Sequence, residues 1–304
     1  MILEDGFAGV LVGLAVGDAL GGPVEEIPNH PSRVPRPISD MVVGGYLRLL
    51  PGQVTDDTEM ALCIAQSIAE KKDFDPADIA QRFIHWFDTN PLGVGGTTRR
   101  AIKRLKEGYA WHEAAQIDYC KNSLGNGSVM RCAPIAMYDA LHSNELVLHS
   151  KDQGIITHPN PECVGSTIFL NTILASLLQG NKKDEAYKKG LHAIVAEDAL
   201  HERYRHIPTL TTFGVSGEVK ATTESAVHCF LSTASFEEAV LKAVNMGGDA
   251  DTRGAVTGAL AGAYYGEDSI PRKWKYKLMD RHTKPIYHEL VAVNLSLYEL
   301  ASRE

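Results

Sequence analysis

The chain has 304 residues, of which 44% are hydrophobic and 22% charged, enough apolar sequence for a substantial buried core. Its 30 basic and 38 acidic residues give a net charge of −8, which argues against a surface that binds nucleic acid by bulk electrostatics. No linker, low-complexity tract or fixed-period repeat divides the chain, so we expect one domain over residues 1–304.

The first predicted element is an apolar helix over residues 7–16. This stretch has the hydrophobicity of a signal peptide, but the acidic Glu4 and Asp5 stand where a basic leader is expected, and Asp18 follows closely. The apolar run is also too short to span a bilayer. We therefore expect a buried helix and no membrane segment.

Amphipathic helices are predicted along most of the remaining chain. Residues 56–71 begin with acids and end with Glu-Lys-Lys, the polarity that the helix dipole favours, and place Ile64 and Ile68 on one face. Residues 76–87 open with a proline and carry apolar side chains at helical spacing. Further helices are predicted over residues 98–105, 160–178, 235–244, 252–265 and 285–300. Few segments alternate like strands, so the expected fold is an all-α orthogonal helical bundle.

The predicted helix over residues 252–265 carries glycines four residues apart, at Gly254, Gly258 and Gly262. Each glycine lowers helix stability by about 1 kcal/mol relative to alanine. Close packing against a neighbouring backbone is the expected compensation. A membrane dimer motif is the competing interpretation, but the run is short and charged residues flank it.

The five cysteines form an odd set without a Cys-x-x-Cys pair. Neither a disulfide framework nor a zinc site is indicated by this pattern. A cytoplasmic location, where thiols stay reduced, is therefore expected.

Two clusters combine hydroxyl and carboxylate side chains: Thr-Asp-Asp-Thr at residues 55–58 and Asp-Ala-Asp-Thr at residues 249–252. Taken alone, each cluster is explained by helix capping. Thr55, Asp56 and Glu59 would form an N-cap with a capping-box carboxylate for the helix over residues 56–71, and Asp251 and Thr252 would cap the helix over residues 252–265. Taken together, the clusters offer hard oxygen ligands that suit Mg²⁺ or Mn²⁺. A divalent metal site shared by the two segments is therefore predicted.

Two glycine-rich segments accompany the acidic clusters. Residues 17–26 combine a helix exit, a Gly-Gly-Pro turn and paired glutamates, and turn chemistry alone explains the glycines and the proline. Residues 125–131 read Gly-Asn-Gly-Ser-Val-Met-Arg, a loop leading into an apolar helical segment, where backbone N–H groups can bind phosphate. Asn-Gly is also a common turn, and neither a Walker lysine motif nor a Gly-x-Gly-x-x-Gly pattern is present.

In this order, the motifs resemble those of the ADP-ribosylglycohydrolase family, which includes dinitrogenase reductase-activating glycohydrolases and ADP-ribosyl-arginine and ADP-ribosyl-serine hydrolases. The likeness runs from Gly17 to Gly262. Its specific parts are Gly-Asp-Ala-Leu-Gly at residues 17–21 with Glu25, the two acidic clusters, the glycine loop and Thr-His at residues 157–158.

The resemblance implies an all-α fold with a pair of Mg²⁺ or Mn²⁺ ions at the base of an ADP-ribose cleft. It implies a hydrolase that cleaves the glycosidic bond between ADP-ribose and an acceptor, either a protein side chain or a small molecule. The implied metal ligands are Thr55, Asp56, Asp57, Asp249, Asp251 and Thr252. The implied substrate-binding residues are Gly125, Asn126, Gly127, Ser128 and His158.

The chemistry implied for this family requires carboxylates near the anomeric carbon. Cleavage there builds positive charge on the sugar ring, which nearby carboxylates stabilise while the metals orient the ribose hydroxyls. Glu25, which matches a glutamate on a mobile loop, or Asp57 would accept a proton from the attacking water as general base. His158 would donate to phosphate or ribose, although a lone histidine is more often structural.

One position departs from the family pattern. Arginine-specific relatives carry Asp-x-Gly-x-Thr-Thr, whose acid can pair with a guanidinium group, whereas Gly93 replaces the acid here. Asp88 is the candidate substitute. If no acid replaces the missing one, a serine linkage or a small-molecule conjugate becomes the favoured substrate.

Two other functions remain open from the residues alone. One is an ADP-ribose-binding protein without turnover, since fold does not guarantee chemistry. The other is a two-metal phosphohydrolase that cuts the ADP-ribose diphosphate. The product distinguishes the three functions. A glycohydrolase releases free ADP-ribose, a binding protein releases no product, and a phosphohydrolase releases AMP and ribose phosphate.

Overall fold

The computed structural model describes residues 3–26, 32 and 34–303. Within these ranges the chain forms helices joined by loops, and β-structure is limited to isolated bridges. The predicted all-α class is confirmed. The α-helices are α1 (Glu4–Gly21), α2 (Asp56–Lys71), α3 (Pro76–Asp88), α4 (Gly96–Lys106), α5 (Ala114–Ile117), α6 (Ala133–Tyr138), α7 (Ser143–Ile155), α8 (Pro161–Leu178), α9 (Lys183–Ala193), α10 (Asp198–Tyr204), α11 (Val219–Leu231), α12 (Phe236–Val244), α13 (Ala250–Tyr265), α14 (Arg272–Lys275) and α15 (Tyr287–Ala301).

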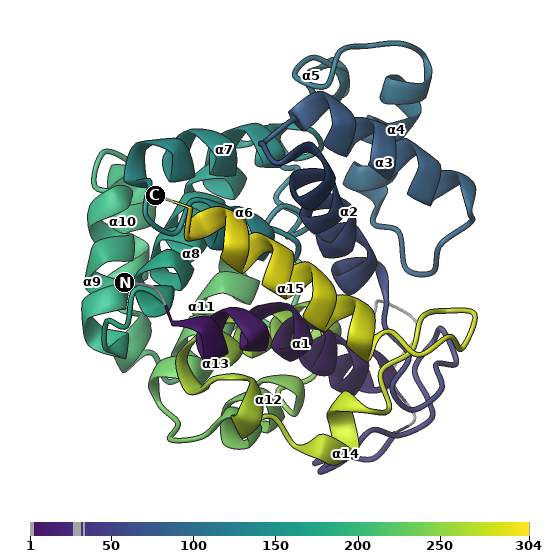
Figure 1. The fold of residues 1–304 in the computed structure, drawn as a ribbon, viewed down its shortest axis with the longest axis vertical. Coiled ribbons are helices and arrows are strands. Elements are labelled where there is room, and N and C mark those ends of the chain that lie inside the picture. The colour runs from purple at the N-terminus through teal and green to yellow at the C-terminus, as the bar shows by residue number, and fades with distance from the viewer. Residues whose placement is uncertain (1–2, 27–31, 33, 304) are drawn as a thin grey trace.

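Helices α1 and α13 lie side by side near the middle of the bundle (Figure 1). A Cβ atom added to Gly258 would lie 2.0 Å from the carbonyl oxygen of Gly13, and one added to Gly21 would lie 2.3 Å from that of Ala250. The two antiparallel backbones therefore touch along the glycine stripe, as the sequence predicted. Because the end of α1 meets the start of α13, the turn that carries Glu25 reaches the acidic loop before α13.

The buried apolar side chains form one continuous cluster that draws on helices from α1 to α15. Helix α1 is buried along nearly its whole length, which confirms the prediction of a buried N-terminal helix. By length and hydropathy alone, residues 4–24 and 161–178 could cross a membrane, yet 94% and 72% of these windows are buried inside the fold. Such burial is typical of core helices.

The predicted helices agree with the structure to within two residues at each end, except that α1 is longer than predicted. The helices that were not predicted are α5, α7, α9, α10, α11 and α14. Helix α11 was missed because its buried face carries polar residues such as Thr222, Thr223 and Ser225 in place of an apolar stripe. The hydroxyl of Ser225 instead donates to the carbonyl of Ala221 one turn earlier, 2.7 Å away. Apolar periodicity cannot reveal such a helix.

Candidate active site

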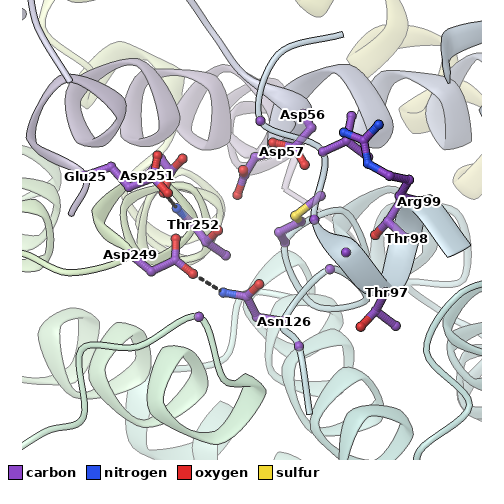
Figure 2. Close-up of a pocket in the computed structure, with 18 of the residues that line it drawn as sticks. Glu25, Asp56, Asp57, Thr97, Thr98, Arg99, Asn126, Asp249, Asp251 and Thr252 are labelled. Atoms are coloured by element: carbon purple, nitrogen blue, oxygen red, sulfur yellow. Dashed lines mark hydrogen bonds between the residues drawn. The ribbon is translucent and has the colours of Figure 1, made fainter. Parts of the chain in front are cut away.

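The turn after α1 and the loop before α13 bring three carboxylates together. One oxygen each from Glu25, Asp249 and Asp251 lies within 4.8 Å of the others, and Figure 2 shows the three side chains grouped on one wall. Burial and the charge of Asp249 raise the pKa of Glu25 to about 8. Burial and the charge of Glu25 raise the pKa of Asp251 well above its usual range. A bound cation would relieve this repulsion.

Helix α2 contributes two more carboxylates from the other side of the same space (Figure 2). Burial and the charge of Asp18 raise the pKa values of both Asp56 and Asp57 well above their usual range. Asp57 and Thr252 line the same cavity, so the start of α2 faces the start of α13. The two acidic clusters therefore meet in space, as the sequence predicted.

Asp18 holds the start of α2 in place. Its carboxylate accepts hydrogen bonds from the backbone N–H and hydroxyl of Thr55, at 3.0 and 2.9 Å, and from those of Thr58, at 3.2 and 2.6 Å. Asp18 was not among the predicted site residues. Its position within an apolar helix could have identified it from the sequence, because an ionisable residue is rarely buried without a hydrogen-bond or charged partner.

The helix-capping interpretation of the two clusters is wrong in detail. Thr55 occupies the N-cap position of α2 but makes no side-chain cap bond, because the backbone N–H of Thr58, which a cap would accept from, donates to Asp18 instead. The carboxylate of Glu59 accepts from the indole N–H of Trp86, 2.7 Å away. The N-cap of α13 is Asp249, also without a side-chain cap bond. Thr55, Glu59 and Asp249 therefore do not cap these helices.

The glycine loop borders the carboxylates. Asn126 donates from Nδ2 to Oδ2 of Asp249, at 2.6 Å, and to the hydroxyl of Thr222, at 2.9 Å, so it holds an acidic side chain in position (Figure 2). A Cβ atom at Gly127 would lie 2.5 Å from Cε1 of His158. Glycine is needed there because the imidazole ring occupies the side-chain space.

These groups surround a cavity of about 630 Å³, within the range of small-molecule sites. Thr55 and Ser128 are fully buried behind its wall and do not line it, and the Ser128 hydroxyl has no hydrogen-bond partner among the described residues. The predicted residues that line the cavity are Glu25, Asp56, Asp57, Gly125, Asn126, Gly127, His158, Asp249, Asp251 and Thr252.

Tyr46 and Arg99 are among the lining residues that were missed. Burial and the charge of Glu25 raise the pKa of Tyr46, so its hydroxyl stays protonated and can donate a hydrogen bond. Arg99 lies in the first turn of α4 with its guanidinium 5.6 Å from the centre of the Phe87 ring. A loop tyrosine and an exposed helical arginine carry no distinguishing pattern in the sequence.

Gly93 lies at the cavity wall beside Asp56. Its φ angle is +78°, and a Cβ atom there would lie 2.9 Å from Oδ1 of Asp56. Asp88, the candidate substitute for the missing acid, pairs with Lys106 and does not line the cavity. The lining residue Glu26 is paired with Arg36 at 2.9 Å. Among the described lining residues, the carboxylates without an ion pair belong to Glu25 and the two acidic clusters.

The donor atoms around the cavity fit a hard divalent cation. They are carboxylate and hydroxyl oxygens, which suit Mg²⁺ or Mn²⁺ better than zinc or copper. Oε2 of Glu25 and Oδ1 of Asp57 are buried and have no hydrogen-bond partner in the described part of the chain. Buried carboxylate oxygens without partners are costly unless a cation or a ligand satisfies them.

Comparison with known proteins gives consistent matches. The family model described as ADP-ribosylglycohydrolase matches residues 1–303. The chain is 36% identical over 277 residues to ADP-ribosyl-[dinitrogen reductase] glycohydrolase from Rhodospirillum rubrum, covering 91% of each protein. It is 33% identical to the ADP-ribosylarginine hydrolase Tri1 from Serratia proteamaculans, covering 90% of this chain and 75% of that protein.

A solved structure described as an ADP-ribosylglycohydrolase-related protein complex has the same fold. It superposes with a TM-score of 0.81 at 34% identity, and the match covers 98% of both chains. A more distant relative is the ADP-ribosylhydrolase ARH3 from Homo sapiens, 26% identical with 88% of each protein covered.

Proposed function

Because the chain belongs to the ADP-ribosylglycohydrolase family, we propose that it hydrolyses the glycosidic bond between ADP-ribose and an acceptor in the cavity described above. One observation carries the proposal: oxygens of Glu25, Asp249 and Asp251 converge within 4.8 Å of one another at the wall of this cavity. Such a group of carboxylates can stabilise the positive charge that develops on a sugar ring.

We infer that two divalent cations, Mg²⁺ or Mn²⁺, bind between the acidic clusters. When bound, they would orient the ribose hydroxyls and supply positive charge. Thr55 lies behind the cavity wall, next to the lining residue Asp57. Because its hydroxyl hydrogen faces the carboxylates of Asp18 and Asp57, at 2.9 and 3.2 Å, the lone pairs of its oxygen stay available to a cation held by Asp57. The proposed ligands are Thr55, Asp56, Asp57, Asp249, Asp251 and Thr252.

The proton chemistry is assigned to Glu25 and Asp57. Each lines the cavity and has one buried oxygen without a protein hydrogen-bond partner, so each has an acceptor free for the attacking water. A carboxylate within hydrogen-bond reach can take the proton of that water. Asn126 supports the site by holding Asp249, and Asp18 supports it by holding the start of α2.

We propose that the acceptor is not arginine, although the Tri1 relatives are named ADP-ribosylarginine hydrolases. A guanidinium acceptor is best recognised by a paired carboxylate. Gly93 supplies none, Asp88 pairs with Lys106, and the cationic Arg99 lines the cavity instead. A neutral hydroxyl acceptor, such as serine on a protein, or a small-molecule conjugate fits this wall better.

The test is chromatographic analysis of products from arginine-linked and serine-linked ADP-ribosyl peptides, with Mg²⁺, with Mn²⁺ and with chelator. Metal-dependent release of free ADP-ribose, fastest from the serine-linked peptide, is expected. The Asp249→Ala variant should lose activity while the exposed Asp184→Ala control retains it. AMP with ribose phosphate would indicate a phosphohydrolase, binding without product would indicate a binding protein, and an active Asp249→Ala variant would refute the metal assignment.

We also propose a cytoplasmic location. All five cysteines are free thiols, and Cys132, Cys163 and Cys229 are buried. Unpaired thiols fit a reducing compartment. Cell fractionation, with recovery in the soluble fraction, checks this prediction.

A further inference from the structure

Arg131 is fully buried behind the cavity wall. Its guanidinium donates from Nε to Oε1 of Gln153, at 3.2 Å, and from Nη2 to the backbone oxygen of Gln153, at 3.3 Å, and to Oγ1 of Thr157, at 2.6 Å. It also lies over the ring of Phe83, 4.6 Å from the centroid. Because a guanidinium can only donate, its position fixes which atoms around it must be acceptors.

Thr157 is one of these acceptors, and its other contact is His158. The distance from Oγ1 of Thr157 to Nδ1 of His158 is 2.7 Å. Since this oxygen accepts from Arg131, its single hydrogen is free to donate, and within the described part of the chain Nδ1 is its remaining partner. Nδ1 is therefore the acceptor, which leaves the proton of the neutral ring on Nε2.

The opposite assignment of the ring proton is unfavourable. An N–H at Nδ1 would leave the threonine hydroxyl hydrogen without an acceptor in a fully buried position, and would point a second donor at an oxygen that already accepts from Arg131. The charged groups that act on the ring are Arg131 and Arg100. Together with burial, they lower the pKa of His158 to about 3, so the ring stays neutral.

The Nε2 edge of the ring lies against the glycine loop. Nε2 is 3.2 Å from a Cβ atom built at Gly125 and 3.1 Å from one built at Gly127. All three residues line the cavity. The two glycines therefore leave space for a ligand atom to approach the N–H at Nε2.

We propose that Arg131 is a positioning residue: acting through the hydroxyl of Thr157, it holds His158 as the neutral tautomer that carries its proton on Nε2. His158 then always presents an N–H donor to an oxygen of the ligand. It binds the ligand and does not transfer protons. The identity of that oxygen, on the diphosphate or ribose of ADP-ribose, rests on the proposed function, whereas the tautomer does not.

The tautomer can be measured directly in the intact protein labelled with ¹⁵N-histidine. The His158 resonances are assigned by their loss in a His158→Gln variant. At about pH 7, the two-bond N–H correlations should show a neutral ring with its proton on Nε2. A proton on Nδ1, or a charged ring, would overturn the proposal without any measurement of activity.

Variants at Thr157 test the relay, by which we mean the contact of Arg131 with His158 through the Thr157 hydroxyl. Thr157→Val keeps the side-chain shape but removes the hydroxyl, and should give a mixed tautomer and about tenfold weaker ADP-ribose binding by calorimetry. KM should rise more than kcat falls, because a binding contact is lost. Thr157→Ser should restore both properties, and Thr172→Val, which removes a partly buried hydroxyl elsewhere in the core, should change neither.

Two results would refute the relay: an unchanged tautomer with unchanged affinity in Thr157→Val, or no recovery in Thr157→Ser. A protein that binds ADP-ribose but releases no product would contradict the proposed hydrolysis and leave the relay intact. If the valine variant does not fold, the wild-type spectrum still decides the tautomer, and Thr157→Ala, which also removes the hydroxyl, tests the relay with the same two measurements.

Discussion

Replacing Gly127 by alanine would push His158 out of its place at the cavity wall. The added methyl carbon would lie 2.5 Å from Cε1 of His158 and 3.1 Å from Oγ1 of Thr98. Carbon atoms in ordinary contact are about 3.5–4.0 Å apart. The ring or the loop must therefore move by about 1 Å, and a displacement of this size at a reacting site can lower activity about 100-fold. The φ angle of Gly127 lies outside the left-handed region, so alanine fits the backbone there and the expected defect is steric.

The matched control is Gly95→Ala, at another lining glycine where a Cβ atom would meet nothing within 4 Å. ADP-ribose affinity by calorimetry and release of ADP-ribose by chromatography should both fall in Gly127→Ala and remain near wild type in Gly95→Ala. Because a strained loop costs about 1–3 kcal/mol, thermal unfolding should show a folded protein in both cases. Wild-type affinity and rate in Gly127→Ala would show that the ring is not held against the loop.

Three further results are expected. Because burial and the charge of Asp249 raise the pKa of Glu25 to about 8, the folded metal-free protein holds more protons than the unfolded chain. Its Tm should fall as pH rises from about 4.5 to about 8, and saturating Mn²⁺ should abolish the fall. A Tm that does not change with pH in the presence of chelator would contradict this. Gly258→Val should lower the free energy of unfolding by about 3 kcal/mol or more in denaturant titrations, because the side chain would meet the backbone of Gly13; an unchanged midpoint would show that the helices can separate freely. Asp18→Asn should weaken Mn²⁺ binding about 10- to 100-fold by calorimetry, because the single acceptor oxygen of an amide cannot accept from all four N–H and hydroxyl donors of Thr55 and Thr58. Wild-type affinity would exclude a positioning role.

Local patterns in the sequence were sufficient for the helical class and for eight of the helices. The apolar spacing and acidic start of residues 56–71 identify α2, and the glycine stripe of α13 predicts its close contact with another helix. The same reasoning failed for α11, where threonines and serines occupy buried positions. Their hydroxyls are satisfied by partners that are visible only after folding.

The candidate site was predicted as a set of residues but not as an arrangement. The sequence showed two acidic clusters with hard oxygen donors, and a family likeness joined them. It did not show that Asp18 holds Thr55, that Asn126 holds Asp249, or that Ser128 lies behind the cavity wall. Each of these facts depends on the direction of a side chain in a contact between distant segments.

The sequence by itself determined the helical class, the residue types at the site and the absence of an acid at position 93, because these depend on local spacing and composition. Only the tertiary structure decided which carboxylates share one space, which polar groups position them and how the imidazole of His158 is protonated. The contact between α1 and α13 brings Glu25 to Asp249, and the buried guanidinium of Arg131 orients a hydroxyl that no local pattern could place. Distances of a few ångströms between residues far apart in the chain decide such properties.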